Sequence, residues 1–152
     1  MSLLYTNIGA KQVDPTPKNM ATNTELTPGT KIVPVVYTTV VGETTADTIN
    51  LLYVPKGTRV FATRSKLRTS AAVAASAFAV HVGFLQDDAV TDVDRFGTAI
   101  NINGGAGEFA LDEPVAYTFL TAGWITMTPS TVTGAVTAAV TIEAELAINY
   151  PN

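Results

Sequence analysis

The run VTIEAELAINY, residues 140–150, decides the fold because its apolar side chains recur at every second position. Side chains on a β-strand alternate between its two faces, so this pattern predicts a strand with one buried face and one face toward solvent. Burial of each large apolar side chain contributes about 1.5–3 kcal/mol, and we expect a charge at Ile142 or Leu146 to destabilise the fold severely. The buried face comprises Val140, Ile142, Ala144, Leu146, Ile148 and Tyr150, and the solvent face Thr141, Glu143, Glu145 and Asn149.

Short alternating runs rich in Val, Ile, Thr, Tyr and Phe continue upstream of this strand, separated by turn-forming residues. Seven or eight such strands favour an all-β fold, a jelly-roll-like antiparallel β-sandwich, over a barrel. We predict strands over residues 32–41, 48–54, 59–67, 78–85 and 115–127, the last divided at Thr121-Ala122-Gly123. We expect a loop or single turn at Ser70 to Ala75, and turns at Gly42, Pro55-Lys56-Gly57, Asn103-Gly104-Gly105 and Pro129.

The first thirty residues have a different composition, with turn formers such as Asp14-Pro15-Thr16-Pro17 and almost no periodic apolar pattern. We therefore predict an extended N-terminal arm over residues 1–30 and a single β-sandwich domain over residues 31–152. A chain of 152 residues with 47% hydrophobic and 14% charged residues has the length and composition of one folded domain with a real core.

Composition also excludes several classes of function. With no cysteine and one histidine, the chain can form no disulfide framework, thiolate zinc site or multi-histidine metal centre. A net charge of -4 makes nucleic acid an unexpected partner. The weakly polar run from Ala71 to Leu85 is too short to span a bilayer, and no basic segment precedes the apolar cluster at Met1 to Tyr5. We expect no membrane association, no secretory signal and synthesis in the cytoplasm.

The sequence contains no assembled catalytic motif. No nucleophile elbow, Walker loop or Rossmann fingerprint occurs, and Gly104-Gly105-x-Gly107 is expected in a turn between strands. The lone His81 is interpreted as a surface or packing residue. The acidic run Asp87, Asp88, Asp92, Asp94 lacks the calcium-loop spacing, so a solvated loop is preferred, with Asp92 and Asp94 the ligands to test if a cation binds. We predict neither enzyme activity nor a cofactor or metal.

Two sets of side chains suggest binding surfaces. Five of the nine basic residues fall within thirteen positions, and the last three are expected on one face of a strand. They form either a solvated strand face or a basic stripe that docks on an acidic protein surface. The stripe comprises Lys56, Arg59, Arg64, Lys66 and Arg68. Trp124 with Tyr117 and Phe119 forms either part of the core or a platform on which a sugar stacks.

The order of motifs from residue 31 to residue 150 resembles that of jelly-roll capsid cement or decoration proteins of tailed bacteriophages. The motifs are VVYT (35–38), ADTINL (46–51), VPKGTRV (54–60), VxVG (80–83), DxDRF (92–96) and YTFLTAGWITMT (117–128). The resemblance implies a non-enzymatic structural protein of the virion, made in the host cytoplasm, that binds the outer capsid surface and cements neighbouring major capsid subunits.

The same resemblance implies that the major capsid protein and further copies of this chain, as a homodimer or homotrimer, are the partners. The basic stripe is then the candidate capsid-docking surface, and the arm is expected to lie along a capsid subunit or a neighbouring copy. The alternatives are a tail, neck or head-fibre component of the virion and a carbohydrate-binding β-sandwich module built on Trp124, Tyr117 and Phe119.

Overall fold

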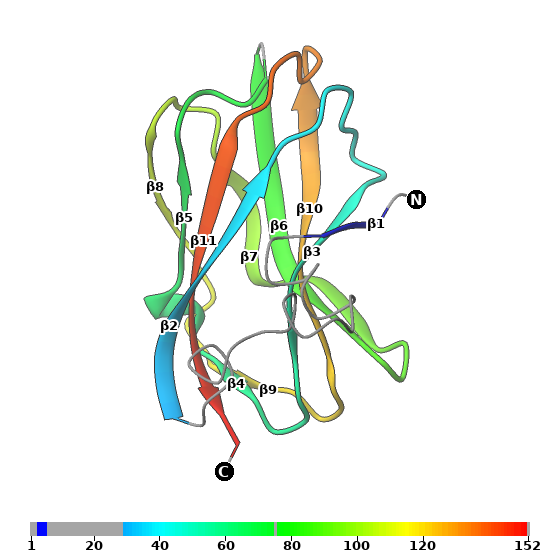
Figure 1. Cartoon of the computed structure of the whole chain (residues 1–152), viewed down its shortest axis with the longest axis vertical. Coiled ribbons are helices and arrows are strands. Elements are labelled where there is room, and N and C mark those ends of the chain that lie inside the picture. Colours follow the sequence, from blue (N-terminus) through cyan, green and yellow to red (C-terminus); the bar gives the residue numbers. More distant parts are fainter. Residues whose placement is uncertain (1–2, 6–28, 75, 152) are drawn as a thin grey trace, which may run out of the picture.

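The computed structural model describes residues 3–5, 29–74 and 76–151, which form two β-sheets packed face to face (Figure 1). The first sheet has the order β1-β3-β10-β6-β7, with β1 (Leu3–Tyr5), β3 (Thr48–Val54), β10 (Gly123–Thr133), β6 (Ala77–Gln86) and β7 (Thr91–Asn101). In the second sheet, β2 (Gly29–Thr38) lies along one edge of β11 (Thr141–Tyr150). The other edge of β11 pairs with β5 (Lys66–Thr69) and β4 (Arg59–Val60), which are followed outward by β8 (Gly107–Ala110) and β9 (Tyr117–Thr118).

The connections between strands identify the topology. If β4 with β5 and β8 with β9 are each taken as one interrupted strand, the sheets read β2-β11-β4/β5-β8/β9 and β3-β10-β6-β7. From β2 onward the chain crosses to the other sheet at every connection between these strands except the β6–β7 hairpin. This is the strand order of a jelly roll. The predicted all-β, jelly-roll-like antiparallel sandwich is confirmed.

The core lies between the sheets and contains the face of β11 that its alternation predicts. Ile142 is 1% exposed and Leu146 is fully buried, so a charge at either position would be placed in an apolar interior. On β6, the predicted apolar face is buried as well. Its members are Phe78, Val80, Val82 and Phe84.

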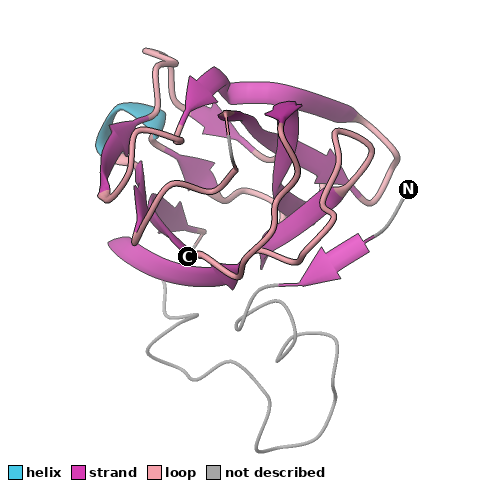
Figure 2. Cartoon of the chain, turned by 90° about the horizontal axis from the view of Figure 1, so that it is seen from above, coloured by secondary structure: helices cyan, strands magenta, loops and turns pink. Residues whose placement is uncertain are grey.

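The prediction of one strand over residues 59–67 is wrong. A 3-10 turn, η2 (Ala62–Arg64), separates β4 from β5 and is the cyan helical element in Figure 2. Phe61 N–H still donates to the Ala147 carbonyl of β11 (2.9 Å), but Ala147 N–H donates to the Ser65 hydroxyl (2.9 Å) instead of to a backbone carbonyl. The Ser65 side chain thus replaces one rung of the ladder, which allows the backbone to turn out of the sheet.

Other boundaries differ from the prediction for local reasons. The strand predicted over 32–41 ends at Thr38, and the predicted division near residue 121 separates β9 from β10. The turn predicted at Pro129 is wrong, because Pro129 lies inside β10 opposite Val80. The register shifts directly after it, which accommodates a residue without an N–H group.

The sequence pattern missed β7 and β8. The pairing of β7 with β6 contains two register shifts, so its side chains do not alternate regularly between faces.

Part of the predicted arm is described: β1 pairs in parallel with β3, and Gly29 and Thr30 belong to β2. Residues 1–2 and 6–28 of the predicted arm lie outside the described residues.

Candidate docking surfaces

The structure divides the predicted basic stripe into two parts. On β5, Lys66 Nζ lies 3.0 Å from Glu108 Oε2 and 3.3 Å from Glu145 Oε2. Arg68 bridges the same two carboxylates at 2.7 and 3.2 Å. Hydrogen bonding to Glu108 raises the pKa of Lys66, and the reciprocal bond lowers the pKa of Glu108. These two cations therefore stabilise contacts between β8, β5 and β11 and have their charge balanced within the sheet.

In the other part of the stripe, Arg59 and Arg64 lie close to the aromatic ring of Phe61. The guanidinium carbon of Arg59 lies 5.2 Å from the centre of the Phe61 ring, and that of Arg64 lies 5.7 Å from it. Arg64 belongs to η2, so the prediction that it shares a strand face with Lys66 and Arg68 is wrong. Arg59, Arg64 and Lys56 are exposed, and within the described ranges they form no ion pair. We call Lys56, Arg59, Phe61 and Arg64 the basic patch; its docking role stays a prediction.

The three aromatic residues proposed as a sugar platform do not come together. Trp124 packs edge-on against Tyr53, with ring centres 5.2 Å apart. Tyr117 stacks on Phe84 at 4.5 Å and Phe119 is 1% exposed, so both rings contact the core between the sheets. Trp124 is next to Ile125, whose side chain is fully buried in that core, and therefore faces the opposite side of its sheet. The structure contradicts a platform built from all three.

The acidic run is dispersed over the β6–β7 hairpin. Asp87 accepts a hydrogen bond from the Tyr53 hydroxyl, and Asp88 Oδ1 accepts one from Val90 N–H at 3.2 Å. Among residues 3–5, 29–74 and 76–151, no three His, Cys, Asp or Glu side chains are grouped so that they could hold a metal ion. The same described ranges contain no helix long and apolar enough to cross a membrane.

The single histidine and the glycine-rich turn have structural contacts. His81 Nδ1 accepts a hydrogen bond from Ala99 N–H at 3.1 Å. In the predicted turn, the Asn103 side chain accepts hydrogen bonds from Val73 N–H and Ala74 N–H, both at 2.8 Å. The turn that includes Gly104 is thereby tied to the loop that follows β5.

Sequence reasoning missed a surface at the upper end of the molecule in Figure 1, which Figure 2 views from above. Hydrogen bonds connect the loops there: Gly42 N–H donates to the Val136 carbonyl (3.1 Å) and Ser76 N–H to the Thr133 carbonyl (3.1 Å). Their described residues include only two charged side chains, Glu43 and Asp47. We call this surface the uncharged end; its loops are residues 39–47, 70–76, 102–106 and 134–140, with Ala75 outside the described residues. The sequence feature that could have indicated this surface is the absence of charged residues from Thr69 to Val80 and from Gly123 to Ile142.

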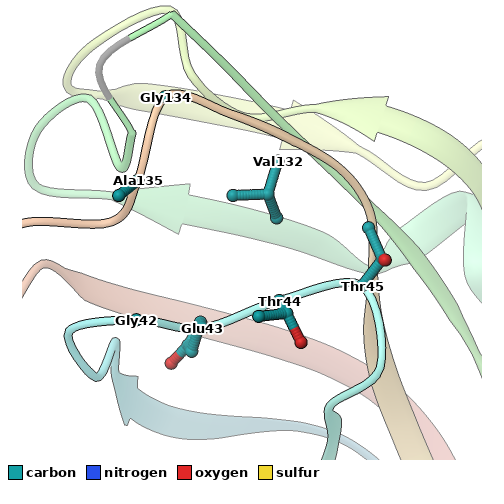
Figure 3. A pocket seen from close by; sticks show the side chains of 7 residues that line it. All are labelled: Gly42, Glu43, Thr44, Thr45, Val132, Gly134 and Ala135. Atoms are coloured by element: carbon teal, nitrogen blue, oxygen red, sulfur yellow. The ribbon is translucent and has the colours of Figure 1, made fainter.

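A projection, formed by the exposed Val40 and Val41, lies beside a hollow on the uncharged end. Val40 is 52% exposed and Val41 is 65% exposed, which is unusual for large apolar side chains at neighbouring positions. The hollow is a pocket of about 300 Å³ between the loop after β2 and the loop after β10 (Figure 3). Its lining residues are Gly42, Glu43, Thr44, Thr45, Val132, Gly134 and Ala135.

The loop that carries the two valines is held by a buried carboxylate. Glu43 is 5% exposed, and its Oε1 accepts hydrogen bonds from the Tyr37 hydroxyl and from Val40 N–H, the latter at 2.6 Å. Figure 3 shows the Glu43 side chain on the side of its loop away from Val132. Burial raises the pKa of Glu43, and burial together with the Glu43 contact raises the pKa of Tyr37. The carboxyl group thus fixes the loop from inside the protein.

Comparison with known proteins bears on the fold. No protein-family model matches the chain, and no curated protein matches it. One chain of the cyanophage Pam1 capsid asymmetric unit is similar, with 15% identity and a TM-score of 0.59 over 82% of this chain and 88% of that one. A chain of the acidic stable capsid structure of Helicobacter pylori bacteriophage KHP30 aligns with 15% identity and a TM-score of 0.46, over 79% of this chain and 87% of that one. Across most of both chains, this protein therefore shares its two-sheet fold with a chain of the Pam1 capsid structure.

Proposed function

We propose that this chain is a non-enzymatic structural protein of a phage virion, which binds the outer surface of the capsid and cements neighbouring major capsid subunits. The observation that carries the proposal is the fold shared with a chain of the Pam1 capsid asymmetric unit, with a TM-score of 0.59. The motif order that resembles capsid cement or decoration proteins supports the same conclusion from the sequence.

The basic patch supplies a chemically reasonable contact with the capsid. Two exposed guanidinium groups close to a partly exposed phenyl ring offer charge-assisted hydrogen bonds and apolar contact at one place. Carboxylates on the major capsid protein are the partners that fit this chemistry. A protein that works by such contacts needs no catalytic side chain, because its function is to hold neighbouring subunits together.

Quantitative mass spectrometry of gradient-purified particles tests the proposal. We expect the number of copies of this chain per major capsid protein to be about one or another simple fraction set by the symmetry axes of the shell. A handful of copies per particle would overturn the cement role in favour of a tail, neck or head-fibre component. Absence from particles would overturn the virion function.

A further inference from the structure

We propose that the uncharged end is a contact surface between two copies of this chain, in which Val40 and Val41 of each copy enter the pocket of the other. This inference concerns the isolated protein and goes beyond capsid binding. It does not depend on the basic patch, because Lys56 and Arg59 lie on elements at the other end of β3 and β11.

Charge is the first reason for choosing a second copy as the occupant. In a two-fold contact the same residues of both copies approach each other, so any charge near the axis meets a like charge. This end limits the repulsion, because its described loops carry only two acidic side chains, of which Glu43 is buried and Asp47 is partly buried and hydrogen-bonded to Thr44 N–H at 2.8 Å. The rest of the described surface carries the basic patch, the ion-paired cluster around Lys66 and the acidic β6–β7 hairpin.

Shape is the second reason. A surface that meets its own copy must carry both a projection and a matching hollow. Val41 directly precedes Gly42, which is the first residue of the pocket lining, so projection and hollow are neighbours. A two-fold rotation about an axis between them places each projection opposite the hollow of the other copy. The pocket, at about 300 Å³, has room for the branched side chain of a valine.

Pre-organisation is the third reason. Val40 N–H donates to the buried Glu43 carboxylate, and Gly42 N–H donates to the Val136 carbonyl of the loop after β10. Gly42 has φ +85°, a conformation that side-chain-bearing residues rarely adopt, so the turn that follows the two valines requires glycine. Projection and hollow are therefore held in fixed positions, and little conformational entropy is lost on association.

Sedimentation velocity of the purified full chain, without capsids, tests the contact. We expect a concentration-dependent dimer. Val41→Asp and Ala135→Lys each place a charge in the contact that meets its own copy, so each is expected to weaken the dimer at least about tenfold. The double variant Val41→Asp/Ala135→Lys is expected to regain association, because the new carboxylate of each copy meets the new ammonium of the other.

The matched control is Val90→Asp, which adds the same charge at a valine that is 50% exposed on the β6–β7 hairpin. It is expected to leave the dimer unchanged, and circular dichroism and thermal melting establish that every variant is folded. A wild-type chain that stays monomeric at all concentrations would overturn the inference. So would a Val41→Asp variant that dimerises normally, or a double variant no stronger than the single ones. Because no capsid is present, these outcomes are separate from those of the particle measurement.

Discussion

Glu43 links the chemistry of one side chain to the stability of the whole sandwich. Burial raises the pKa of its carboxyl group in the folded state above the value in the unfolded chain. A group shifted in this direction stabilises the fold below its unfolded pKa, and that contribution is lost as pH rises through the folded pKa. The protein is therefore expected to lose stability as the pH rises above the ordinary range of a glutamate.

Replacing this residue by glutamine tests the linkage. Glu43→Gln keeps an oxygen that accepts from Tyr37 and Val40 but removes the ionisation. We expect the difference in unfolding free energy between low and neutral pH to be smaller in the variant than in the wild-type protein. Urea denaturation over a range of pH measures the unfolding free energy of both proteins. A variant whose stability depends on pH as steeply as that of the wild type would contradict the assignment of this dependence to Glu43.

Gly83 shows why one position in β6 cannot carry a side chain. A Cβ atom there would lie 2.0 Å from the Asp92 carbonyl oxygen and 2.4 Å from the Val93 carbonyl carbon of β7. Gly83→Ala is therefore expected to reduce the unfolding free energy by at least about 2 kcal/mol. Gly104→Ala is the control, since its Cβ meets nothing within 4 Å, and the change there should stay within about 0.5 kcal/mol. Similar destabilisation by the two substitutions would show that the β6–β7 approach is not the cause.

At the scale of elements, β4 and η2 carry the surface proposed to bind the capsid. Arg59→Glu/Arg64→Glu reverses both charges beside Phe61 and is expected to weaken binding to particles at least about tenfold, because capsid carboxylates would then be repelled. Arg59→Lys/Arg64→Lys keeps the charge but loses the planar donors, so part of the affinity should remain. Cosedimentation with particles that lack this protein measures binding, and wild-type binding by the reversed variant would refute the docking surface.

The elements also show what the sequence could predict. β6 and β11 were predicted because each keeps its large apolar residues on one face. β7 was missed because its bulged pairing with β6 interrupts the alternation, and the break at η2 depends on a hydrogen bond from a distant strand to Ser65. The same limit applies to the surfaces. Clustering of basic residues in the sequence does not reveal that Glu108 and Glu145 balance two of them, since those carboxylates come from β8 and β11.

At the scale of the molecule, the predicted arm can be separated from the sandwich. β1 contributes three residues, which pair with the edge of β3. Because β2 begins at Gly29, a deletion that removes the arm and keeps β2 should end at residue 28. We expect the chain lacking residues 1–28 to stay folded by circular dichroism but to lose binding to particles, as the proposed role of the arm in docking requires. Retained particle binding would contradict that role.

The position of β11 in its sheet has a consequence for synthesis of the protein. β2, β4 and β5 all pair with β11, and β11 follows each of them by at least about seventy residues along the chain. While the ribosome is translating, β2 has no partner in the second sheet until residues 141–150 have emerged from the exit tunnel, and β4 and β5 can pair on one edge only, with β9 and β8. The sheet is therefore completed only after translation of β11, and until then the nascent chain exposes the unpaired edges of apolar strands.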